Sequence, residues 1–303
     1  LINEEGINLD TWKNQLQESE QGNIHDFVQR IIDKNLRNSV FADVTANAEV
    51  AGVYGSLLGK SVSVVACNKI ACSSSYASYH KLKALSREYN AHFFFETNVG
   101  AGLPVIGTLN DLLRSGDKVN RIQAVLSGTL NFVFNNYDGT KLFADGVRQA
   151  HDEGYTEPDP RLDLGGTDVM RKIMILAREA GQQLEMEDIS NQYFLPLSCF
   201  EGSVADFYDE MAKQEPHFKK LYEAAVTENC KLKFVANYEN GKASVGLRHI
   251  PAESDFYHLY GKDNLVLFYT DRYPEQPLVI KGAGAGSDVT ASGVFADIIR
   301  VAR

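Results

Sequence analysis

The sequence predicts an α/β protein with a Rossmann-like parallel-sheet domain and a second domain of α+β type. Three observations support this. Strand-like and helix-like segments alternate over residues 23–96, glycines and a proline mark a boundary near Asn98 to Pro104, and longer strands with a hairpin signal follow. With 303 residues, 44% of them hydrophobic, the chain is long enough for two domains.

The first domain begins with a predicted helix from Asn23 to Leu36, where apolar residues recur at helical spacing behind an asparagine suited to cap it. Strands and helices alternate after it. The expected strands are Val40–Thr45, Ser61–Ala66 and His92–Glu96, and the expected helices are Glu49–Leu58 and Ser75–Tyr89. Short connections in this order are typical of a parallel sheet flanked by helices.

The second domain is predicted to mix helices and strands without regular alternation. Its expected helices are Pro104–Leu113, Thr129–Asn136, Lys141–Glu153 and Thr167–Ala180, and its expected strands are Asn120–Leu126, Lys231–Tyr238 and Ala243–Ile250, before a last helix Val289–Ala302. Gly181 can end the fourth of these helices. The Asn240-Gly241 pair predicts a two-residue hairpin turn between the last two strands.

Charge and cysteine content restrict the class of partner. The net charge is −10 and the pI about 5.2, which provides no basic surface for nucleic acid or an anionic membrane. No apolar run approaches the ~18 residues of a membrane-spanning helix. We therefore expect a small-molecule ligand, with no nucleic-acid or membrane partner. Four cysteines without a CxxC pair indicate reduced thiols and a cytoplasmic location.

Three positions in the first domain point to a bound nucleotide. Thr45 and Ala46 end the first expected strand, Asn68 and Lys69 follow the second, and Glu96 ends the third. Ligands of open parallel sheets bind outside these carboxyl ends, where a lysine can reach phosphate or ribose oxygens. The alternative is that Thr45 and Asn68 only cap turns or helices.

Glycine-rich sequence occurs late in the chain rather than after a first strand. The segment Gly282-Ala-Gly-Ala-Gly286 is preceded by no nucleotide-type strand and helix. One interpretation is a flexible turn into the last helix. The other is a backbone approach to the nicotinamide or ribose of a dinucleotide.

The richest group of charged residues lies between Gly154 and Lys172. Prolines and glycines restrict a loop there, and Asp168 and Lys172 stand four residues apart on one face of the helix that follows. An ordinary surface salt bridge is the alternative interpretation of that pair. A lysine among carboxylates can also donate a proton during carbonyl reduction, while neighbouring acids bind a substrate ammonium. The histidines show no metal-ligand spacing.

These motifs resemble homoserine dehydrogenases over nearly the whole chain. The matching segments are Glu96-Thr-Asn-Val-Gly-Ala-Gly-Leu-Pro104, Ser127-Gly-Thr-Leu-Asn-Phe132, Gly154-Tyr-Thr-Glu-Pro-Asp-Pro-Arg161, Asp168-Val-Met-Arg-Lys172 and the ending from Gly286 through Asp297. The resemblance implies reversible NAD(P)H-dependent interconversion of aspartate semialdehyde and homoserine, in threonine and methionine biosynthesis. It also implies a homodimer or higher homo-oligomer.

The resemblance assigns roles residue by residue. It makes Lys172 the proton donor and Asp163 a further catalytic carboxylate, with Glu157 and Asp168 binding the amino-acid substrate. The implied contacts to NADP or NAD are Thr45, Ala46, Lys69, Gly154 and Gly286.

The resemblance further implies a monovalent cation, usually sodium, held by Glu96 and the backbone carbonyls of Val99, Ala101 and Leu103. A hard cation suits such oxygen ligands. In the alternative, Glu96 accepts hydrogen bonds from nearby helix N–H groups and no ion binds.

One departure from the family concerns the start of the chain. Homoserine dehydrogenases begin with a strand and a glycine-rich turn that holds the pyrophosphate, and this sequence starts beyond it, at Leu1. We therefore expect an incomplete Rossmann-like domain, formed by residues 1–98 and 284–303, and a catalytic and dimerisation domain formed by residues 99–283. The arrangement is similar to the C-terminal part of bifunctional aspartokinase–homoserine dehydrogenases.

Two other functions stay open. A catalytically inactive fragment or assembly module of a bifunctional enzyme would need the fold but not Lys172. An acylating aspartate-semialdehyde dehydrogenase would need a cysteine nucleophile beside a base, and Cys67 lies in no such motif.

Overall fold

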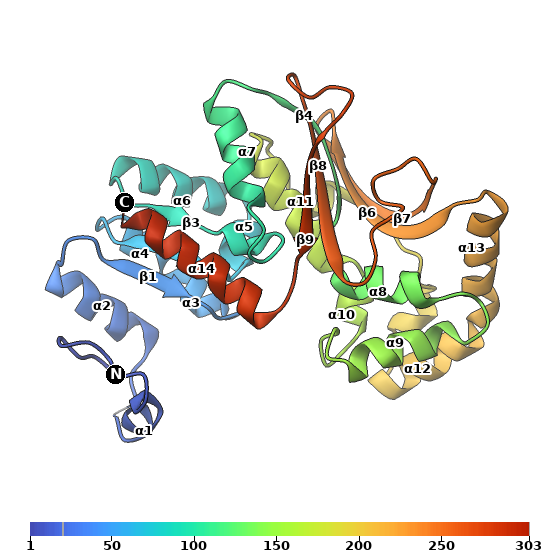
Figure 1. The fold of residues 1–303 in the computed structure, drawn as a ribbon. Helices are drawn as coiled ribbons and strands as arrows, with labels where there is room; N and C mark the ends of the chain where they lie inside the picture. The colour runs from blue at the N-terminus through green and yellow to red at the C-terminus, as the bar shows by residue number, and fades with distance from the viewer. Residues whose placement is uncertain (20, 303) are drawn as a thin grey trace.

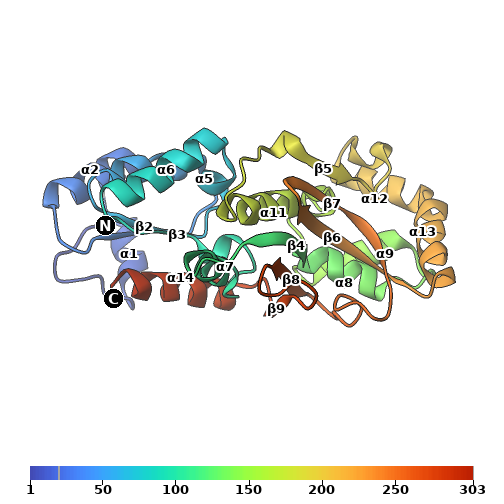
Figure 2. The ribbon, with the colours of Figure 1, turned by 90° about the horizontal axis from the view of Figure 1, so that it is seen from above.

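The computed structural model describes residues 1–19 and 21–302. Two β-sheets lie toward opposite ends of an elongated molecule, and both chain ends are near the smaller sheet (Figures 1 and 2). The smaller sheet has three parallel strands in the order β1-β2-β3, and the larger has six strands in the order β5-β7-β6-β4-β8-β9. The predicted α/β class with a parallel sheet is confirmed.

The smaller sheet consists of β1 (Val40–Asp43), β2 (Ser63–Ala66) and β3 (Phe93–Phe94). The helices of this part are α1 (Trp12–Gln17), α2 (Ile24–Lys34), α3 (Ala48–Gly52), α4 (Tyr54–Leu58), α5 (Ile70–Ser73) and α6 (Tyr76–Glu88). All of β2 is buried because it is the central strand. Asn23 and Ser75 cap α2 and α6, as their positions in the sequence suggest.

Two elements of this part differ from the prediction. The single helix expected over Glu49–Leu58 is divided into α3 and α4 at Val53, directly after Gly52, a residue that disfavours helix. The strand expected to reach Glu96 ends at Phe94, and the 3-10 helix η1 (Glu96–Asn98) turns the chain out of the sheet. This turn places Glu96 at the junction with the second part.

The larger sheet consists of β4 (Val119–Val125), β5 (Ile189–Gln192), β6 (Lys231–Glu239), β7 (Lys242–Ile250), β8 (Asp263–Thr270) and β9 (Leu278–Ala283). Its pairs are antiparallel except for β5 with β7. Asn240 and Gly241 both have positive φ between β6 and β7, which confirms the predicted hairpin.

Helices cover one face of the larger sheet, where α8 and α11 contact β6. The helices here are α7 (Val105–Arg114), α8 (Gly128–Asn136), α9 (Phe143–Asp152), α10 (Arg161–Leu164), α11 (Thr167–Glu179), α12 (Val204–Lys213) and α13 (Glu215–Thr227), with 3-10 helices η2 (Met186–Asp188) and η3 (Leu197–Phe200). A second apolar cluster includes Val235 and Leu267 of the sheet with Phe256 and Leu259.

The last helix, α14 (Ser287–Val301), returns from the larger sheet to the smaller one, where it contacts β1 and β2 (Figure 1). The smaller sheet is therefore contacted by a helix from the C-terminal end of the described chain, although its own strands all lie in the first hundred residues. A division into residues 1–98 with 284–303 and residues 99–283 stays a prediction. Among the described residues, no helix combines the length and apolar character needed to cross a bilayer.

A buried carboxylate joins the two parts of the molecule. Glu179, at the end of α11, accepts hydrogen bonds from the Tyr79 hydroxyl and the Lys83 ammonium of α6, and from the Asn110 amide of α7. Its side chain is only 1% exposed. Since three donors converge on one buried acceptor, removal of that acceptor leaves all three without their partner.

We expect Glu179→Ala to lower the free energy of unfolding by about 3 kcal/mol, because it breaks a buried ion pair from one side. Urea denaturation measures this change. Asp111→Ala is the matched control, since Asp111 pairs with Arg114 on the surface and both side chains are more than 70% exposed. Equal effects of the two substitutions would contradict a special role for the buried carboxylate.

Candidate active site

A cavity of about 900 Å³ lies between the two parts of the molecule. Its lining includes every residue that the sequence assigns to catalysis, substrate or nucleotide: Thr45, Ala46, Lys69, Gly154, Glu157, Asp163, Asp168, Lys172 and Gly286. Residues far apart in the sequence thus meet at one place. Of the four residues assigned to a cation, only Ala101 lines this cavity.

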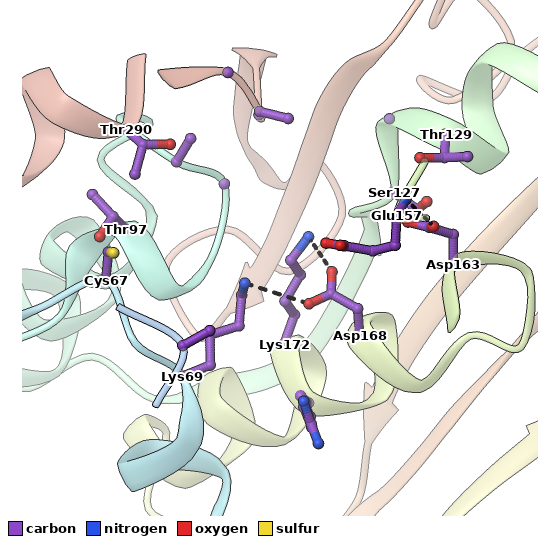
Figure 3. A pocket seen from close by; sticks show the side chains of 18 of the residues that line it. Cys67, Lys69, Thr97, Ser127, Thr129, Glu157, Asp163, Asp168, Lys172 and Thr290 are labelled. Carbon is purple, nitrogen blue, oxygen red and sulfur yellow. Dashed lines mark hydrogen bonds and ion pairs between the residues drawn. The ribbon is translucent and has the colours of Figure 1, made fainter. Parts of the chain in front are cut away.

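Asp168 and Lys172 form the central ion pair of the cavity. Both project from α11, and Lys172 Nζ lies 2.7 Å from Asp168 Oδ2 (Figure 3). The i,i+4 pairing predicted from the sequence is confirmed, but this is no ordinary surface bridge, because the Lys172 side chain is only 11% exposed. Lys69, at the carboxyl end of β2, lies 3.4 Å from the other oxygen of Asp168. One carboxylate therefore connects lysines from both parts.

A backbone carbonyl completes the surroundings of the Lys172 ammonium. Lys172 Nζ donates a hydrogen bond of 2.7 Å to the oxygen of Leu126, directly after β4. Burial opposes ionisation of Asp168, but the charges of Lys172 and Lys69 outweigh burial and lower the pKa of Asp168. Asp168 is thus held in its charged form, and the two hydrogen bonds of Lys172 Nζ leave its remaining hydrogen for the cavity.

The acidic loop before α11 is internally braced. Asp163 Oδ2 accepts a 2.8 Å hydrogen bond from the backbone N–H of Glu157, and Arg161 pairs with Asp159 at 2.6 Å. Arg161 also donates to the carbonyl of Gly202 at 2.8 Å, which anchors the loop from outside. Figure 3 shows the Glu157 side chain pointing toward the Lys172–Asp168 pair. The braced loop therefore presents the Glu157 carboxylate to the lysine across the cavity.

Asp163 ionises less readily than an ordinary aspartate. Burial, followed by the charges of Glu157 and Asp168, raises its pKa to about 6, while the Glu157 N–H and Lys172 act in the opposite direction. A perturbed carboxyl in a cavity is typical of a functional site.

The edge of the cavity at the carboxyl ends of β1 and β2 is organised by Asp43, a residue that no sequence motif pointed to. Its buried carboxylate accepts hydrogen bonds from the backbone of Thr45 at 2.7 Å and from the side chain of Asn68 at 3.0 Å. Thr45 Oγ1 in turn accepts a hydrogen bond from the Asn47 N–H. Thr45 therefore makes the turn-capping contact that was the alternative to nucleotide binding. Since Thr45 and Asn68 also line the cavity, capping and ligand contact are compatible.

Two glycines let the backbone border the cavity in conformations that other residues rarely adopt. Gly154 has φ +74° and follows the end of α9, where its N–H bonds to the carbonyl of His151. Gly286 has φ +122° directly before α14. Nothing lies within 4 Å of the position of a side chain at either glycine. These features suit the approach of a dinucleotide to the backbone.

The residues assigned to a cation are arranged differently from a metal site. Glu96 Oε1 accepts from the Ile106 N–H at 2.6 Å, and Oε2 accepts from Gly107 at 2.8 Å and Arg300 at 3.2 Å. Glu96 therefore caps α7, whose N-cap residue Pro104 has no capping side chain. This arrangement is the predicted alternative in which Glu96 accepts hydrogen bonds from nearby helix N–H groups. With both oxygens bonded and a guanidinium adjacent, the carboxylate does not fit a further cation as arranged.

Several residues that line the cavity were assigned no role from the sequence. Ser127 caps α8, the Thr129 hydroxyl donates to the Tyr155 carbonyl, and Lys262 reaches the rim with its ammonium 4.8 Å from the Tyr155 ring centre. The Ser-Gly-Thr motif at 127–129 was available as a signal. Lys262 stands in no motif, and only the fold brings it here.

Residues 104–299 match the family description Homoserine dehydrogenase. The chain belongs to the homoserine dehydrogenase family. It is 42% identical to a Zea mays protein named bifunctional aspartokinase/homoserine dehydrogenase 2, chloroplastic, over all of this chain and 34% of that protein. The chain thus spans about a third of the length of this curated relative.

Two solved structures are similar to this chain over almost its whole length. A Candida auris protein of unknown function is 34% identical, with a TM-score of 0.90 over 98% of this chain and 84% of that one. A hyperthermophilic archaeal homoserine dehydrogenase in complex with NADPH is 26% identical, with a TM-score of 0.72 over 97% of this chain and 82% of that one.

We expect the Asp163 carboxyl to titrate with a midpoint of about 6, which carbon-detected NMR can measure. Because the folded state raises this pKa, ionisation opposes folding. The stability of the wild type relative to Asp163→Asn should therefore fall as the pH rises from about 4 to about 6. A midpoint near the ordinary aspartate value would contradict this description of the loop.

Proposed function

We propose that this chain is the dehydrogenase part of an enzyme that reversibly reduces L-aspartate 4-semialdehyde to L-homoserine with NADPH or NADH, in threonine and methionine biosynthesis. Family membership supports the reaction class. The observation that carries the proposal is the ammonium of Lys172, fixed by Asp168 and Leu126 with its remaining hydrogen free for the cavity.

Lys172 acts as the proton donor in this proposal. Reduction of the aldehyde adds a hydride to carbon and a proton to oxygen, so a donor must stand beside the oxygen. The Lys172 ammonium gives its proton to the developing alkoxide and takes it back in the reverse reaction. Asp168 stabilises the charged amine between these steps, while Lys69 compensates the charge of Asp168.

The acidic loop binds and orients the amino-acid substrate. Glu157 and Asp163 place negative charge at the side of the cavity that Ser127 and Thr129 border (Figure 3). A substrate ammonium held there is fixed relative to Lys172, which converts an encounter of separate groups into a reaction within one complex. Asp168 would share this role through its partly exposed carboxylate.

NAD(P) supplies the hydride when bound. Thr45, Ala46 and Lys69 at the carboxyl ends of β1 and β2, together with Gly154 and Gly286, would hold it. The NADPH complex of the archaeal enzyme supports this class of cofactor.

The remaining assignments concern the complete protein. We propose that it carries an aspartokinase, as the names of curated relatives from Zea mays and Haemophilus influenzae state for those proteins. Homo-oligomerisation and a cytoplasmic location stay predictions, the latter resting on four cysteines that are free thiols here. The plant relatives are named chloroplastic.

The direct test is NADPH oxidation with aspartate semialdehyde, measured for this chain, an N-terminally extended chain and the extended chain with Lys172→Ala. We expect kcat of the extended chain to fall about 10²- to 10⁴-fold on loss of Lys172, because general acid catalysis is lost. Lys219→Ala, which removes an exposed lysine of α13, is the matched control.

The outcomes separate the hypotheses. Absence of activity from every version would favour an assembly module. An active Lys172→Ala protein would keep the reaction but overturn the mechanism. Activity lost on thiol alkylation, together with phosphate-dependent acyl transfer, would indicate the acylating enzyme class instead.

Glu96 already has three donors, which leaves its carboxylate without a free place for a monovalent cation. We expect the activity and the melting temperature of the extended chain to be unchanged when sodium is replaced by tetramethylammonium at constant ionic strength. Arg300→Gln should lower the melting temperature, since it leaves Glu96 and Asp297 buried without their cation. A sodium requirement in the wild type would restore the predicted ion site.

A further inference from the structure

The side chain of Asn264 lies behind the wall of the cavity. Asn264 belongs to β8 and is completely buried. Its amide packs directly against Gly284 of the glycine-rich segment, because a side-chain carbon added at Gly284 would lie 2.1 Å from both Cγ and Nδ2 of Asn264. Gly284 itself lines the cavity. Asn264 thus occupies the space that any larger residue at position 284 would need.

The same amide nitrogen contacts the carbonyl that holds Lys172. Asn264 Nδ2 donates to the oxygen of Leu126 at 3.4 Å, and that oxygen also accepts from Lys172 Nζ at 2.7 Å. A continuous series of contacts therefore runs from Gly284 through Asn264 and Leu126 to the Lys172 ammonium. It connects the segment before α14 with the charged residue of α11.

Stability of the fold does not explain why a residue with an amide side chain stands at position 264. Its Oδ1 is buried without a hydrogen-bond partner among the described residues. An unmade bond of this kind costs roughly 1–3 kcal/mol, which an apolar side chain of the same shape would avoid. A buried amide that carries this cost points to a use for its N–H group.

We propose that Asn264 is a positioning residue for the reaction, fixing the Lys172 ammonium relative to the glycine-rich wall of the cavity. The inference rests on the proposed function, in which carbon and oxygen of one carbonyl group receive a hydride and a proton. Both donors must then be placed together, and a displacement of about 1 Å can cost on the order of 10²-fold in rate. Asn264 contacts both Gly284 of the glycine-rich wall and the Leu126 carbonyl that holds Lys172.

The test uses Asn264→Ala and Asn264→Leu in the N-terminally extended chain. Alanine removes the amide, whereas leucine has a similar volume, no charge and no N–H donor. We expect kcat to fall tenfold or more in both, with the KM for aspartate semialdehyde changed less than threefold. The primary isotope effect with NADPH deuterated at the transferred position should increase, because hydride transfer becomes slower relative to the other steps.

Asn136→Ala is the control, since Asn136 is an exposed amide that also donates to a carbonyl, that of Phe132, but does not line the cavity. It should leave kcat and the isotope effect within twofold of the wild type. Folded Asn264 variants with unchanged kcat and isotope effect would overturn the proposal. Loss of activity in Asn264→Ala alone would show that volume, rather than the N–H group, matters and would also overturn it.

A second readout does not depend on activity. The NMR resonance of the Lys172 ammonium, assigned through its loss in Lys172→Ala, should shift in both Asn264 variants and not in Asn136→Ala. If the extended wild type were inactive and this shift occurred, the proposed function would fail while the positional link stood. If the resonance did not move, the positioning role would be contradicted whatever the activity.

Discussion

The site depends on one constraint, a lysine ammonium held in a largely buried place by one carboxylate and one carbonyl oxygen. Lys172 is stable there because Asp168 lies 2.7 Å away and Leu126 offers a second acceptor at the same distance. Such an ammonium would be costly without these partners. It also follows that α11 and the end of β4 must be placed together before the cavity can carry any chemistry.

The two parts of the molecule are joined at the same place. Lys69 crosses from the smaller sheet to Asp168, and Glu179 at the far end of α11 receives donors from α6 and α7. Helix α11 therefore serves as a common support whose first two turns bear Asp168 and Lys172 and whose last turn holds the parts together. The acidic loop adds carboxylates on the other side, and the buried position of Asp163 makes its charge sensitive to pH near 6.

Much of this could be predicted from the sequence where the signal was local. Helical spacing identified the Asp168–Lys172 pair, strand ends identified Thr45 and Lys69, and Asn240-Gly241 identified the hairpin. Contacts between distant segments gave no such signal. Asp43, Leu126 and Asn264 act through burial and backbone geometry, which periodicity does not encode. Glu96 shows the opposite case, where a motif suggested an ion but the N-terminus of α7 and Arg300 engage the carboxylate.

The most direct test of the central claim is a crystal structure of the N-terminally extended chain with NADP and homoserine bound. The account predicts that Lys172 Nζ keeps Asp168 and Leu126 as partners and lies about 3 Å from the homoserine hydroxyl oxygen, within hydrogen-bonding distance. A hydroxyl that faces another donor, with Lys172 still turned toward Asp168 and out of its reach, would contradict the assignment of the proton donor.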